Sequence, residues 1–516
     1  MQILFSIVCN FIFEYEYFCI SLLKNLENRM KLTIERKDNI IYPDNHRVIA
    51  RFFYNNEERA EKLISHILVM DEEKILSLLN QILREFSKRH RSITAIYKKH
   101  YNNVKHIATK LNGGNNISEA RKLLIGSYFT MEFALESAAL FNPSIVEDPD
   151  QSGLQAGETR VIISLRATGE GHISSLEFRR AIINEKNEIS LLDPGTYIDE
   201  AEHIKNYLYN KKSFISKLQE MKIEPDFYKL VLDQLPERFT YDQIRETLKD
   251  AEELEGLLLM EQQKAIEEIL WLADSYTEIR FSMDTDLSER VIFPISKFEI
   301  KGIEDARFVK FVKEDGEIIY YCTYTAYDGY TILPRLIETK DFLTFRISPF
   351  HGKYAINKNM ALFPRKINGR YAMISRIDGV NNYIMFSSKL HTWNSAQLLQ
   401  EPVYPWQLVQ IGNGGSPIET DKGWLLITHG VGPVRKYCLG ACLLDIDNPS
   451  KIIGRLKEPL LLPDEDERAG YVPNVVYTCG SYVHKDELII PYAMSDYASS
   501  FASVKLDDLL NELQAD

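Results

Sequence analysis

The sequence predicts a mainly β protein with two helical regions, and a repeat carries most of that prediction. Four C-terminal segments share one plan: an apolar strand, a polar or glycine turn, then a strand rich in aromatic and β-branched residues. Their turn glycines Gly316, Gly369 and Gly423 lie 53 and 54 residues apart. A fifth copy, over 142–163, precedes a helical stretch. Five such units fit a five-bladed β-propeller with N-terminal and inserted α-helical regions, and a β-sandwich with separate helical domains is the alternative.

The N-terminal segment is expected to lie outside the fold. Residues 3–13 form an apolar run, but no Lys or Arg precedes it and no small-residue cleavage site follows it. The run is also too short to span a bilayer. A more ordinary start appears at Met30, so we expect 1–29 to be a non-native or loose N-terminal extension of a cytoplasmic protein.

Helical periodicity marks two further regions. Apolar residues recur at helical spacing from about 57 to 140, and Ser118 before Glu119 is typical of a helix start. The same period returns from about 200 to 279, where the helices read as an insertion. The expected division is therefore a helical N-terminal region over 30–140, the first blade over 141–199, the helical insertion over 200–280, and the remaining blades with a C-terminal tail over 281–516.

Composition narrows the possible partners. The chain has 61 Lys and Arg against 74 Asp and Glu, a net charge of −13, so its field repels nucleic-acid backbones and anionic membranes. The six cysteines have neither the spacing nor the nearby histidines of a zinc site, so we expect buried free thiols and no metal.

The repeat also predicts where chemistry should lie. In a propeller, the first strand of each blade ends at the central funnel, so polar residues at equivalent places in the units should converge there. Carboxyl groups are the usual acids for breaking a glycosidic bond, and Lys, Arg and His side chains converging on a funnel would hold an anion such as phosphate.

Several ordered motifs in these units resemble glycoside hydrolase family 130, the β-mannoside phosphorylases and β-1,2-mannosidases. The resemblance covers roughly 140–200 and 295–505. It is carried by GIEDAR at 302–307, TYTAYDG at 323–329, NKNMALFP at 357–364, GWLLITHG at 423–430 and GYVPNVV at 470–476. Ala306 stands where the family usually has proline, a change that loosens the backbone at that position.

The resemblance implies an inverting reaction on β-mannosides. Asp328 matches the residue that supplies the proton through a sugar hydroxyl while inorganic phosphate attacks the anomeric carbon from the opposite face. Phosphate then replaces an activated water, so one protein carboxyl group suffices and no cofactor is implied. The alternative for Asp328 is a simple turn residue before Gly329.

The resemblance also implies a phosphate site and a sugar site. The phosphate residues would be Lys358, Arg376, Gln410 and His429, with Lys358 in place of the family's Arg and Gln410 in place of its Lys. The substrate-binding residues would be Asn142, Arg166, Glu304, Asp305, Arg307, Tyr327, Asn359, Tyr437 and Asp496. Alternatively, Arg166 and Arg376 form ion pairs between blades, and His429 is a core histidine bonded to the backbone.

The sequence therefore predicts an inverting β-mannoside phosphorylase that takes β-mannosyl oligosaccharides and inorganic phosphate and releases α-mannose 1-phosphate. Hydrolysis by a β-1,2-mannosidase of the same family is the alternative, because Gln410 removes a positive charge from the phosphate site. A non-catalytic carbohydrate-binding propeller is the third possibility. The helical regions could close over the funnel or form a homo-oligomer interface.

Overall fold

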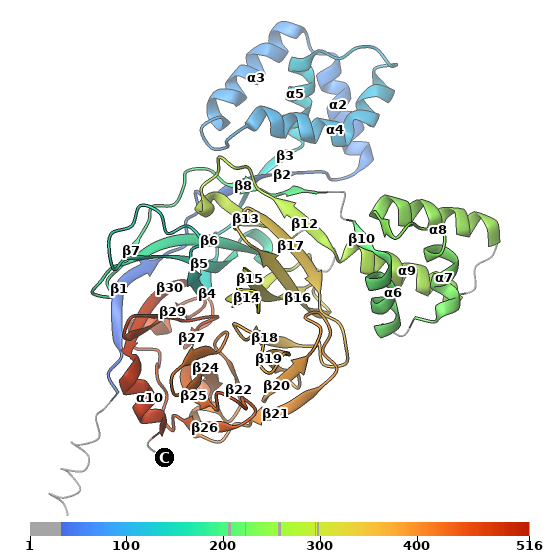
Figure 1. The fold of residues 1–516 in the computed structure, drawn as a ribbon. Coiled ribbons are helices and arrows are strands. Elements are labelled where there is room, and N and C mark those ends of the chain that lie inside the picture. The colour runs from blue at the N-terminus through green and yellow to red at the C-terminus, as the bar shows by residue number, and fades with distance from the viewer. Residues whose placement is uncertain are drawn as a thin grey trace, which may run out of the picture.

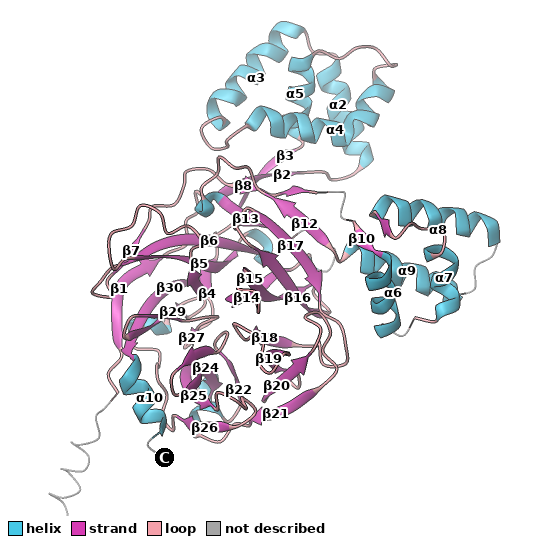
Figure 2. Cartoon of the chain, viewed as in Figure 1, coloured by secondary structure: helices cyan, strands magenta, loops and turns pink. Residues whose placement is uncertain are grey.

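The computed structural model describes residues 32–204, 208–221, 223–255, 260–294, 296 and 299–514, and the predicted extension 1–29 lies outside them. The protein is mainly β, with two helical units beside the strands (Figures 1 and 2).

Most strands of the described chain fall into five successive antiparallel groups. The first is β4 (Ala139–Glu147), β5 (Thr159–Thr168), β6 (Ser174–Ile183) and β7 (Ile189–Leu191); the second is β14 (Gly302–Val312), β15 (Ile318–Tyr327), β16 (Ile332–Thr339) and β17 (Thr344–Pro349). The third is β18 (Lys358–Leu362), β19 (Tyr371–Arg376), β20 (Asn382–Ser387) and β21 (Ala396–Gln400). The fourth is β22 (Gln410–Asn413), β23 (Ile418–Thr420), β24 (Gly423–Val431), β25 (Tyr437–Leu444) and β26 (Ile452–Arg455), and the fifth is β27 (Val476–Tyr477), β28 (Tyr482–His484), β29 (Glu487–Met494) and β30 (Ala498–Lys505).

Contacts between the chain ends bring the fifth group beside the first. β1 (Glu35–Ile41) pairs with β30 and so forms the outer edge of the fifth group. The backbone N–H of Leu140 in β4 donates to the carbonyl of Tyr497 at 2.8 Å. Figure 1 shows the groups in chain order around a common centre. The first two groups belong to one 12-stranded sheet, because Gly302 of β14 pairs with Ser174 of β6. The described strands form no closed sheet. The five-bladed propeller therefore stays a prediction.

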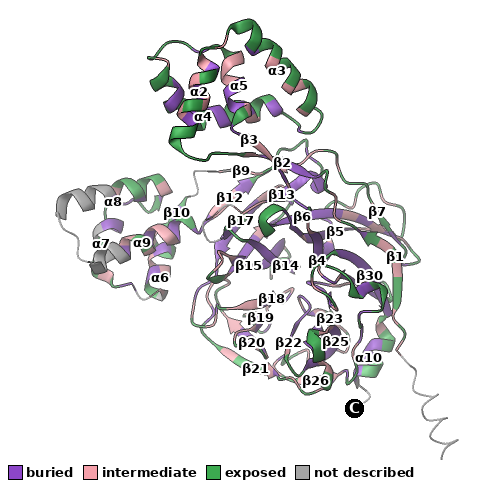
Figure 3. Cartoon of the chain, turned by 180° about the vertical axis from the view of Figure 1, so that it is seen from behind, coloured by how far each residue is buried: buried purple, intermediate pink, exposed green. Residues whose placement is uncertain are grey.

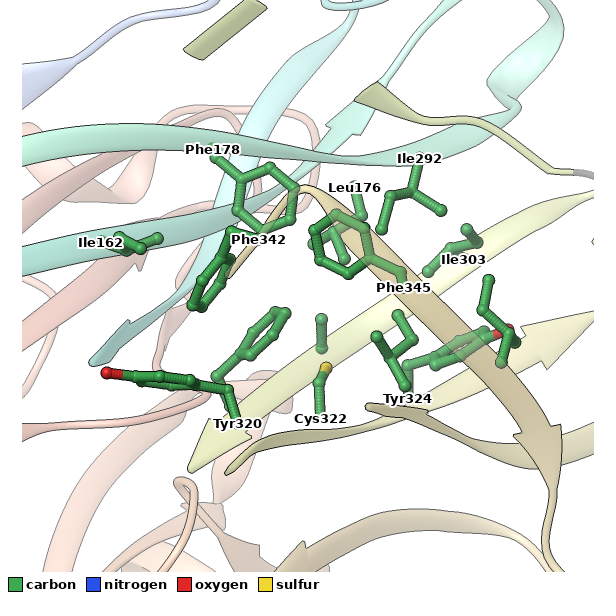
Figure 4. Packing of buried hydrophobic residues seen from close by; sticks show 14 of the residues in the cluster. Ile162, Leu176, Phe178, Ile292, Ile303, Tyr320, Cys322, Tyr324, Phe342 and Phe345 are labelled. Atoms are coloured by element: carbon green, nitrogen blue, oxygen red, sulfur yellow. The ribbon is translucent and has the colours of Figure 1, made fainter. Parts of the chain in front are cut away.

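An aromatic core joins the first two groups. Phe178 of β6 stacks on Phe345 with ring centres 6.0 Å apart and meets the edge of Phe342 at 5.9 Å. Figure 4 shows these rings above Tyr320, Cys322 and Tyr324 of β15. Each aromatic pair adds about 0.5–1.5 kcal/mol beyond the burial of its area, so this packing fixes the two groups against each other. Figure 3 shows β4, β5, β6 and β14 largely buried.

The N-terminal helical region is shorter than predicted. Its helices are α2 (Glu57–Leu68), α3 (Glu72–Phe86), α4 (Ile93–Leu111) and α5 (Glu119–Tyr128), and Ser118 caps α5 by accepting from the N–H of Arg121. The prediction of a helical region over 30–140 is wrong at both ends, because β1 belongs to the fifth strand group and β2 (Val48–Phe52) pairs with β3 (Thr130–Ala134). The apolar face of the predicted helix included Met131 and Leu135, but these residues lie four apart, a spacing that suits strand alternation as well as a helix.

The predicted insertion contains α6 (Lys211–Glu220), α7 (Pro225–Leu232), α8 (Tyr241–Glu255) and α9 (Met260–Asp274). It has its own core, which includes Phe214, Tyr228 and Phe239. Short strands surround it: β8 (Asp199–Glu200), β9 (Glu202–His203), β10 (Tyr209–Asn210), β11 (Arg238–Phe239), β12 (Thr277–Arg280) and β13 (Arg290–Ile292). β12 pairs with β17 and so attaches the insertion to the second strand group.

The remaining elements are peripheral. Helix α10 (Leu506–Gln514) ends the described chain, and its Leu509, Leu510 and Leu513 pack into the core of the fourth and fifth groups. Cys322, Cys438, Cys442 and Cys479 are free and buried, as expected, whereas Cys9 and Cys19 lie outside the described residues. Within the described chain, we find no helix with the length and hydropathy needed to cross a bilayer.

Candidate functional site

Ten of the fourteen predicted site residues line one cavity of about 190 Å³ at the inner strands of the groups. They are Asn142, Arg166, Glu304, Asp305, Lys358, Arg376, Gln410, His429, Tyr437 and Asp496. Arg435, Val472, Val475 and Tyr477 complete the lining. Residues from all five strand groups therefore converge, as the repeat predicts.

A backbone conformation that recurs in three strand groups directs one predicted site side chain from each toward the cavity or the layer beneath it. Asn142, Asp305 and Asn359 have φ of 50°, 53° and 65°, in the left-handed region. Each lies at a register shift on the first strand of its group, in β4, β14 and β18. Asn and Asp tolerate this conformation better than other residues with a side chain, and a bulge re-aims the side chain it carries.

Glu304 links two cations across the cavity. Its carboxylate accepts from Arg166 at 2.8 Å and from the Nζ of Lys358 at 2.6 Å. Lys358 in turn lies opposite Arg376 in the pairing of β18 with β19. The predicted ion pair between groups is therefore present for Arg166, and it holds that side chain at the cavity wall.

Asp305 is ionised in this setting. Its Oδ1 accepts from the Nδ2 of Asn142 at 2.8 Å. Burial opposes its ionisation, but Arg307, Arg166 and Lys358 outweigh that effect and lower the pKa of the Asp305 carboxyl. The cavity therefore keeps a fixed negative charge beside its cations.

His429 is held by the backbone and is uncharged. Its Nδ1 lies 3.0 Å from the carbonyl oxygen of Asn413, so Nδ1 carries the proton, and Nε2 accepts from Arg376 at 3.3 Å. Burial, Arg376 and Arg307 hold the pKa of His429 well below its usual value. Gly412 allows this close packing, because a Cβ there would lie 2.3 Å from the imidazole Cε1. The expectation of a backbone-bonded histidine therefore holds for a residue that also lines the cavity.

Arg307 and Asn359 lie one layer below the lining. The guanidinium of Arg307 donates to the hydroxyl of Tyr477 at 2.6 Å, and Asn359 Nδ2 donates to the same oxygen at 3.1 Å. Arg307 also donates to Asn413 Oδ1 at 3.2 Å. These two predicted site residues therefore position Tyr477, which the motif-based prediction missed because its last motif ended one residue earlier, at Val476.

Buried polar atoms without partners cluster at the cavity. Asn142 Oδ1, Arg166 Nε, Asn359 Oδ1 and Arg376 Nε have no hydrogen bond among the described residues. Leaving such atoms unsatisfied costs about 1–3 kcal/mol each, and a bound ligand or water is the usual remedy. Four such atoms at or just below one cavity favour a polar ligand there.

Asp496 differs from the other carboxylates of the lining. It has no hydrogen bond or ion pair with any described residue, and its φ is 51°. Burial raises the pKa of its carboxyl to about 7; Arg166 and Arg435 oppose this rise, while Asp305 and Glu304 add to it. Asp496 can therefore hold or release a proton near neutral pH.

Asp328 and Tyr327 lie outside the lining. Asp328 is in the loop between β15 and β16, where its Oδ1 accepts from the N–H groups of Thr331 at 2.5 Å and Tyr330 at 2.7 Å. Those bonds lower the pKa of the Asp328 carboxyl. The hydroxyl of Tyr327 donates to the carbonyl of Gly329 in the same loop. In this arrangement Asp328 does act as the turn residue that the alternative proposed.

Arg435 is a cavity residue that sequence reasoning missed. It ends a short 3₁₀ turn (Pro433–Arg435), and both Val434 and Arg435 have positive φ, at 57° and 55°. Gly432 and Pro433 mark a turn in the sequence, but no local pattern shows that Arg435, two residues before the predicted Tyr437, lines the cavity. The structure thus adds the guanidinium of Arg435 to the cavity lining. In the same lining, Gln410 donates a long hydrogen bond to the hydroxyl of Tyr437 at 3.3 Å.

The arrangement suits a sugar beside an anion. Arg376, Lys358 and Arg435 can neutralise an anion, while the carboxylate and amide groups match sugar hydroxyls. Across the described residues, no group of three or more His, Cys, Asp or Glu side chains is arranged to hold a metal ion. Fold and site together define a mainly β protein with a polar, partly cationic cavity.

Comparisons with known proteins identify the family to which the chain belongs. A family model described as beta-1,4-mannooligosaccharide phosphorylase matches residues 257–515. The 1,2-beta-oligomannan phosphorylase of Thermoanaerobacter sp. is 37% identical over 222 residues, which are 41% of this chain and 71% of that protein. The chain therefore belongs to glycoside hydrolase family 130, a family of enzymes that act on glycosides.

Two further matches come from Listeria innocua, one by sequence and one by structure. A beta-1,2-mannobiose phosphorylase is 30% identical over 234 residues, which are 44% of this chain and 64% of that protein, so the match spans slightly less than two thirds of its length. The solved beta-1,2-mannobiose phosphorylase in complex with beta-1,2-mannobiose has a TM-score of 0.45 and 22% identity, over 74% of this chain and 94% of that one.

Proposed function

We propose that the protein is an inverting β-mannoside phosphorylase that uses inorganic phosphate to cleave β-mannosyl oligosaccharides and releases α-mannose 1-phosphate. One observation carries the proposal: three basic side chains lie together at the cavity wall. Lys358 is opposite Arg376 in the strand pairing, and Arg376 donates to His429. The chain that holds them belongs to family 130. The relatives named above are phosphorylases of mannosides, which supports the same substrate class.

In this proposal, phosphate binds at Arg376 and Lys358. Arg376 has a buried Nε without a partner among the described residues, and Lys358 can exchange its ion pair with Glu304 for phosphate. His429 can take up a proton at Nε2 once an anion lies beside Arg376, because the anion offsets the repulsion that lowers the pKa of the imidazole. The new contact of Lys358 and the protonation of His429 would both place positive charge beside the phosphate, where it stabilises the transition state.

The sugar would lie on the Asn142, Arg166 and Asp305 side of the cavity. The unsatisfied Oδ1 of Asn142 can accept from a sugar hydroxyl, and the Nε of Arg166 can donate to one. Bond breaking at the anomeric carbon sends an electron pair to the glycosidic oxygen, which takes a proton, while a phosphate oxygen forms the new bond on the opposite face. Inversion of a β-mannoside by this route gives the α-phosphate.

Asp328 is the proposed source of that proton. For this role, the loop after β15 must release the two N–H bonds to the carboxylate and turn it toward the cavity. The released carboxyl then loses the interactions that lower its pKa, so protonation becomes easier at the moment when an acid is needed.

Hydrolysis is the second candidate, and Asp496 favours it. This cavity carboxyl has no partner among the described residues and a pKa raised to about 7, so it could activate water in place of phosphate. Gln410, which brings no charge, also weakens the case for phosphate.

Product analysis distinguishes the two reactions. The purified protein is incubated with β-1,2- and β-1,4-linked mannobiose, each with and without inorganic phosphate, and the products are separated by anion-exchange chromatography. Mannose 1-phosphate that forms only with phosphate is the expected result. Free mannose at the same rate in both conditions would make the protein a hydrolase, and no product from either linkage would leave a carbohydrate-binding role.

A further inference from the structure

One cation of the cavity wall has no partner. The described lining contains the cations Arg166, Lys358, Arg376 and Arg435. Glu304 accepts from the first two, and Arg376 donates to His429. The Arg435 guanidinium forms neither a hydrogen bond nor an ion pair with any described residue. Its fork of N–H donors is therefore available to a ligand.

Arg435 lies at the mouth of the cavity, on the turn between β24 and β25. Gln410 pairs with Val431, and Val431 pairs with Tyr437, so the strand pairing ends beside the lining residue Gln410. The turn over 432–436 continues beyond this point. Because Arg435 is exposed and also lines the cavity, its side chain links the cavity to the solvent.

The turn is held at its base and strained at its tip. The N–H of Gly432 donates to the carbonyl of Lys436 at 3.0 Å, which closes the turn. Trp406 packs against the base, where a Cβ on Gly432 would lie 3.1 Å from Trp406 Cα. Val434 and Arg435 both have left-handed φ, which residues other than glycine rarely adopt. Such strain is concentrated at functional sites, where it positions a side chain.

The charge of Arg435 reaches the cavity. It opposes the rise in the pKa of the Asp496 carboxyl that burial produces. The protein as a whole has a net charge of −13 and repels anions at a distance. The exposed guanidinium reverses this field at the mouth, whereas Lys358 and Arg376 are half-buried. An approaching anion is therefore drawn first to Arg435.

Under the function proposed above, phosphate competes with water for the anomeric carbon. Phosphate bound by Lys358 must displace Glu304 from its 2.6 Å contact, and Gln410 offers no charge. Arg435 binds an anion without breaking a contact, and a guanidinium matches two phosphate oxygens at once. Water needs no cation, and Asp496 is available as its base. The free guanidinium therefore favours phosphate and not water.

We propose that Arg435 determines the choice between phosphate and water by binding incoming phosphate at the mouth of the cavity. This role rests on the function proposed above, because it needs a cavity that accepts phosphate. In both reactions the bond between the anomeric carbon and the glycosidic oxygen breaks, and that oxygen keeps the electron pair and takes a proton from Asp328. A phosphate oxygen forms the new bond in phosphorolysis. In hydrolysis, water forms it and gives a proton to Asp496.

The ratio of the two reactions tests this role. Each phosphorolysis of mannobiose releases one mannose 1-phosphate and one mannose, whereas each hydrolysis releases two mannose molecules. Half of the excess of mannose over mannose 1-phosphate is therefore the amount hydrolysed. The full chain is incubated with the β-linked mannobiose that it cleaves, at rising concentrations of inorganic phosphate, and both products are quantified. Because the ratio counts only turnovers that occur, an inactive fraction of a variant does not change it.

We expect Arg435→Gln to raise about tenfold the phosphate concentration at which the two reactions are equally fast. Arg435→Lys keeps the charge without the fork and should lie between Arg435→Gln and the unmodified protein. The matched control is Lys436→Gln, which removes a positive charge from the same turn but not from the described lining. This control should change that concentration less than about twofold. Added NaCl should raise it more in the unmodified protein than in Arg435→Gln, because salt screens an exposed charge.

Three other outcomes count against this role of Arg435. An unchanged ratio in Arg435→Gln, or an equal change in Lys436→Gln, would overturn it, while mannose 1-phosphate formed by the unmodified protein would still support the proposed function. Phosphorolysis alone, with no excess of mannose at any phosphate concentration, would also overturn it, because phosphate then has no competitor. Absence of mannose 1-phosphate from the unmodified protein would contradict the proposed function and this role together.

Discussion

The wall of the first cavity and the loop that carries Asp328 are neighbours in sequence, yet the structure holds them in opposite ways. Glu304 and Asp305 lie at a bulge within a long strand and are bonded to residues of other strand groups. Asp328 lies at the end of the next strand and is bonded to its own turn. The binding groups are therefore preorganised by the sheets, whereas the proposed acid depends on a change in a short loop.

The largest expected effect is on Asp328. Asp328→Asn keeps an acceptor for the turn but removes the acid, so we expect kcat to fall about 10²–10⁴-fold with little change in thermal stability. Asp378→Asn is the matched control, because Asp378 also precedes a glycine and accepts from two N–H groups of its own turn at 2.8 Å. The measurement is the steady-state rate of mannose 1-phosphate release.

The same assay shows where the proton comes from. If Asp328→Asn and Asp378→Asn retain equal activity while Asp496→Asn loses it, the proton donor belongs to the cavity wall and not to the loop. In that case the binding residues and the acid would both belong to the fixed cavity wall, and no movement of the Asp328 loop would be needed.

A smaller effect is expected at Gln410. Gln410→Lys adds a cation beside Arg376 and Lys358, so the KM for phosphate should fall about tenfold while the KM for the mannoside stays the same. Gln397→Lys makes the same exchange at an exposed position of β21 and should leave both constants unchanged. An unchanged or higher KM for phosphate in Gln410→Lys would show that phosphate does not approach this part of the wall.

The smallest effect concerns stability and Asp496. Its pKa of about 7 in the folded protein exceeds the usual 3.8, so the folded state binds the proton more tightly than the unfolded state. The free energy of unfolding that Asp496 contributes is therefore present below about pH 4 and is lost as the pH rises through 7. Asp496→Asn should be more stable than the unmodified protein at pH 8, and this advantage should disappear near pH 4.

Urea unfolding followed by circular dichroism between pH 4 and pH 8 measures this difference. Asp421→Asn, at an exposed turn position, serves as the control and should follow the pH dependence of the unmodified protein. Parallel curves for Asp496→Asn and the unmodified protein would mean that Asp496 is ionised throughout, like Asp305.

Local patterns of residues were enough to predict the sheet repeat and the helical insertion, and the motifs that resemble family 130 predicted most of the cavity lining. Strand alternation, turn glycines and motif order are properties of short segments, so the amino-acid sequence alone assigned residues such as Asn142, Arg166 and Arg376 to the site. Local patterns failed where two structures share a spacing, as at Met131 and Leu135, or where a partner strand is distant, as for β1 on β30.

The protonation states and the contacts of the cavity side chains, in contrast, depend on the tertiary structure. The neutral state of His429 depends on Asn413 and Arg376, and the raised pKa of Asp496 depends on burial among charges from three separate segments. Arg435 and Tyr477 line the cavity together with residues that lie far from them in the sequence. Electrostatic energies follow distance and burial in space, and neither quantity is encoded in a local pattern of residues.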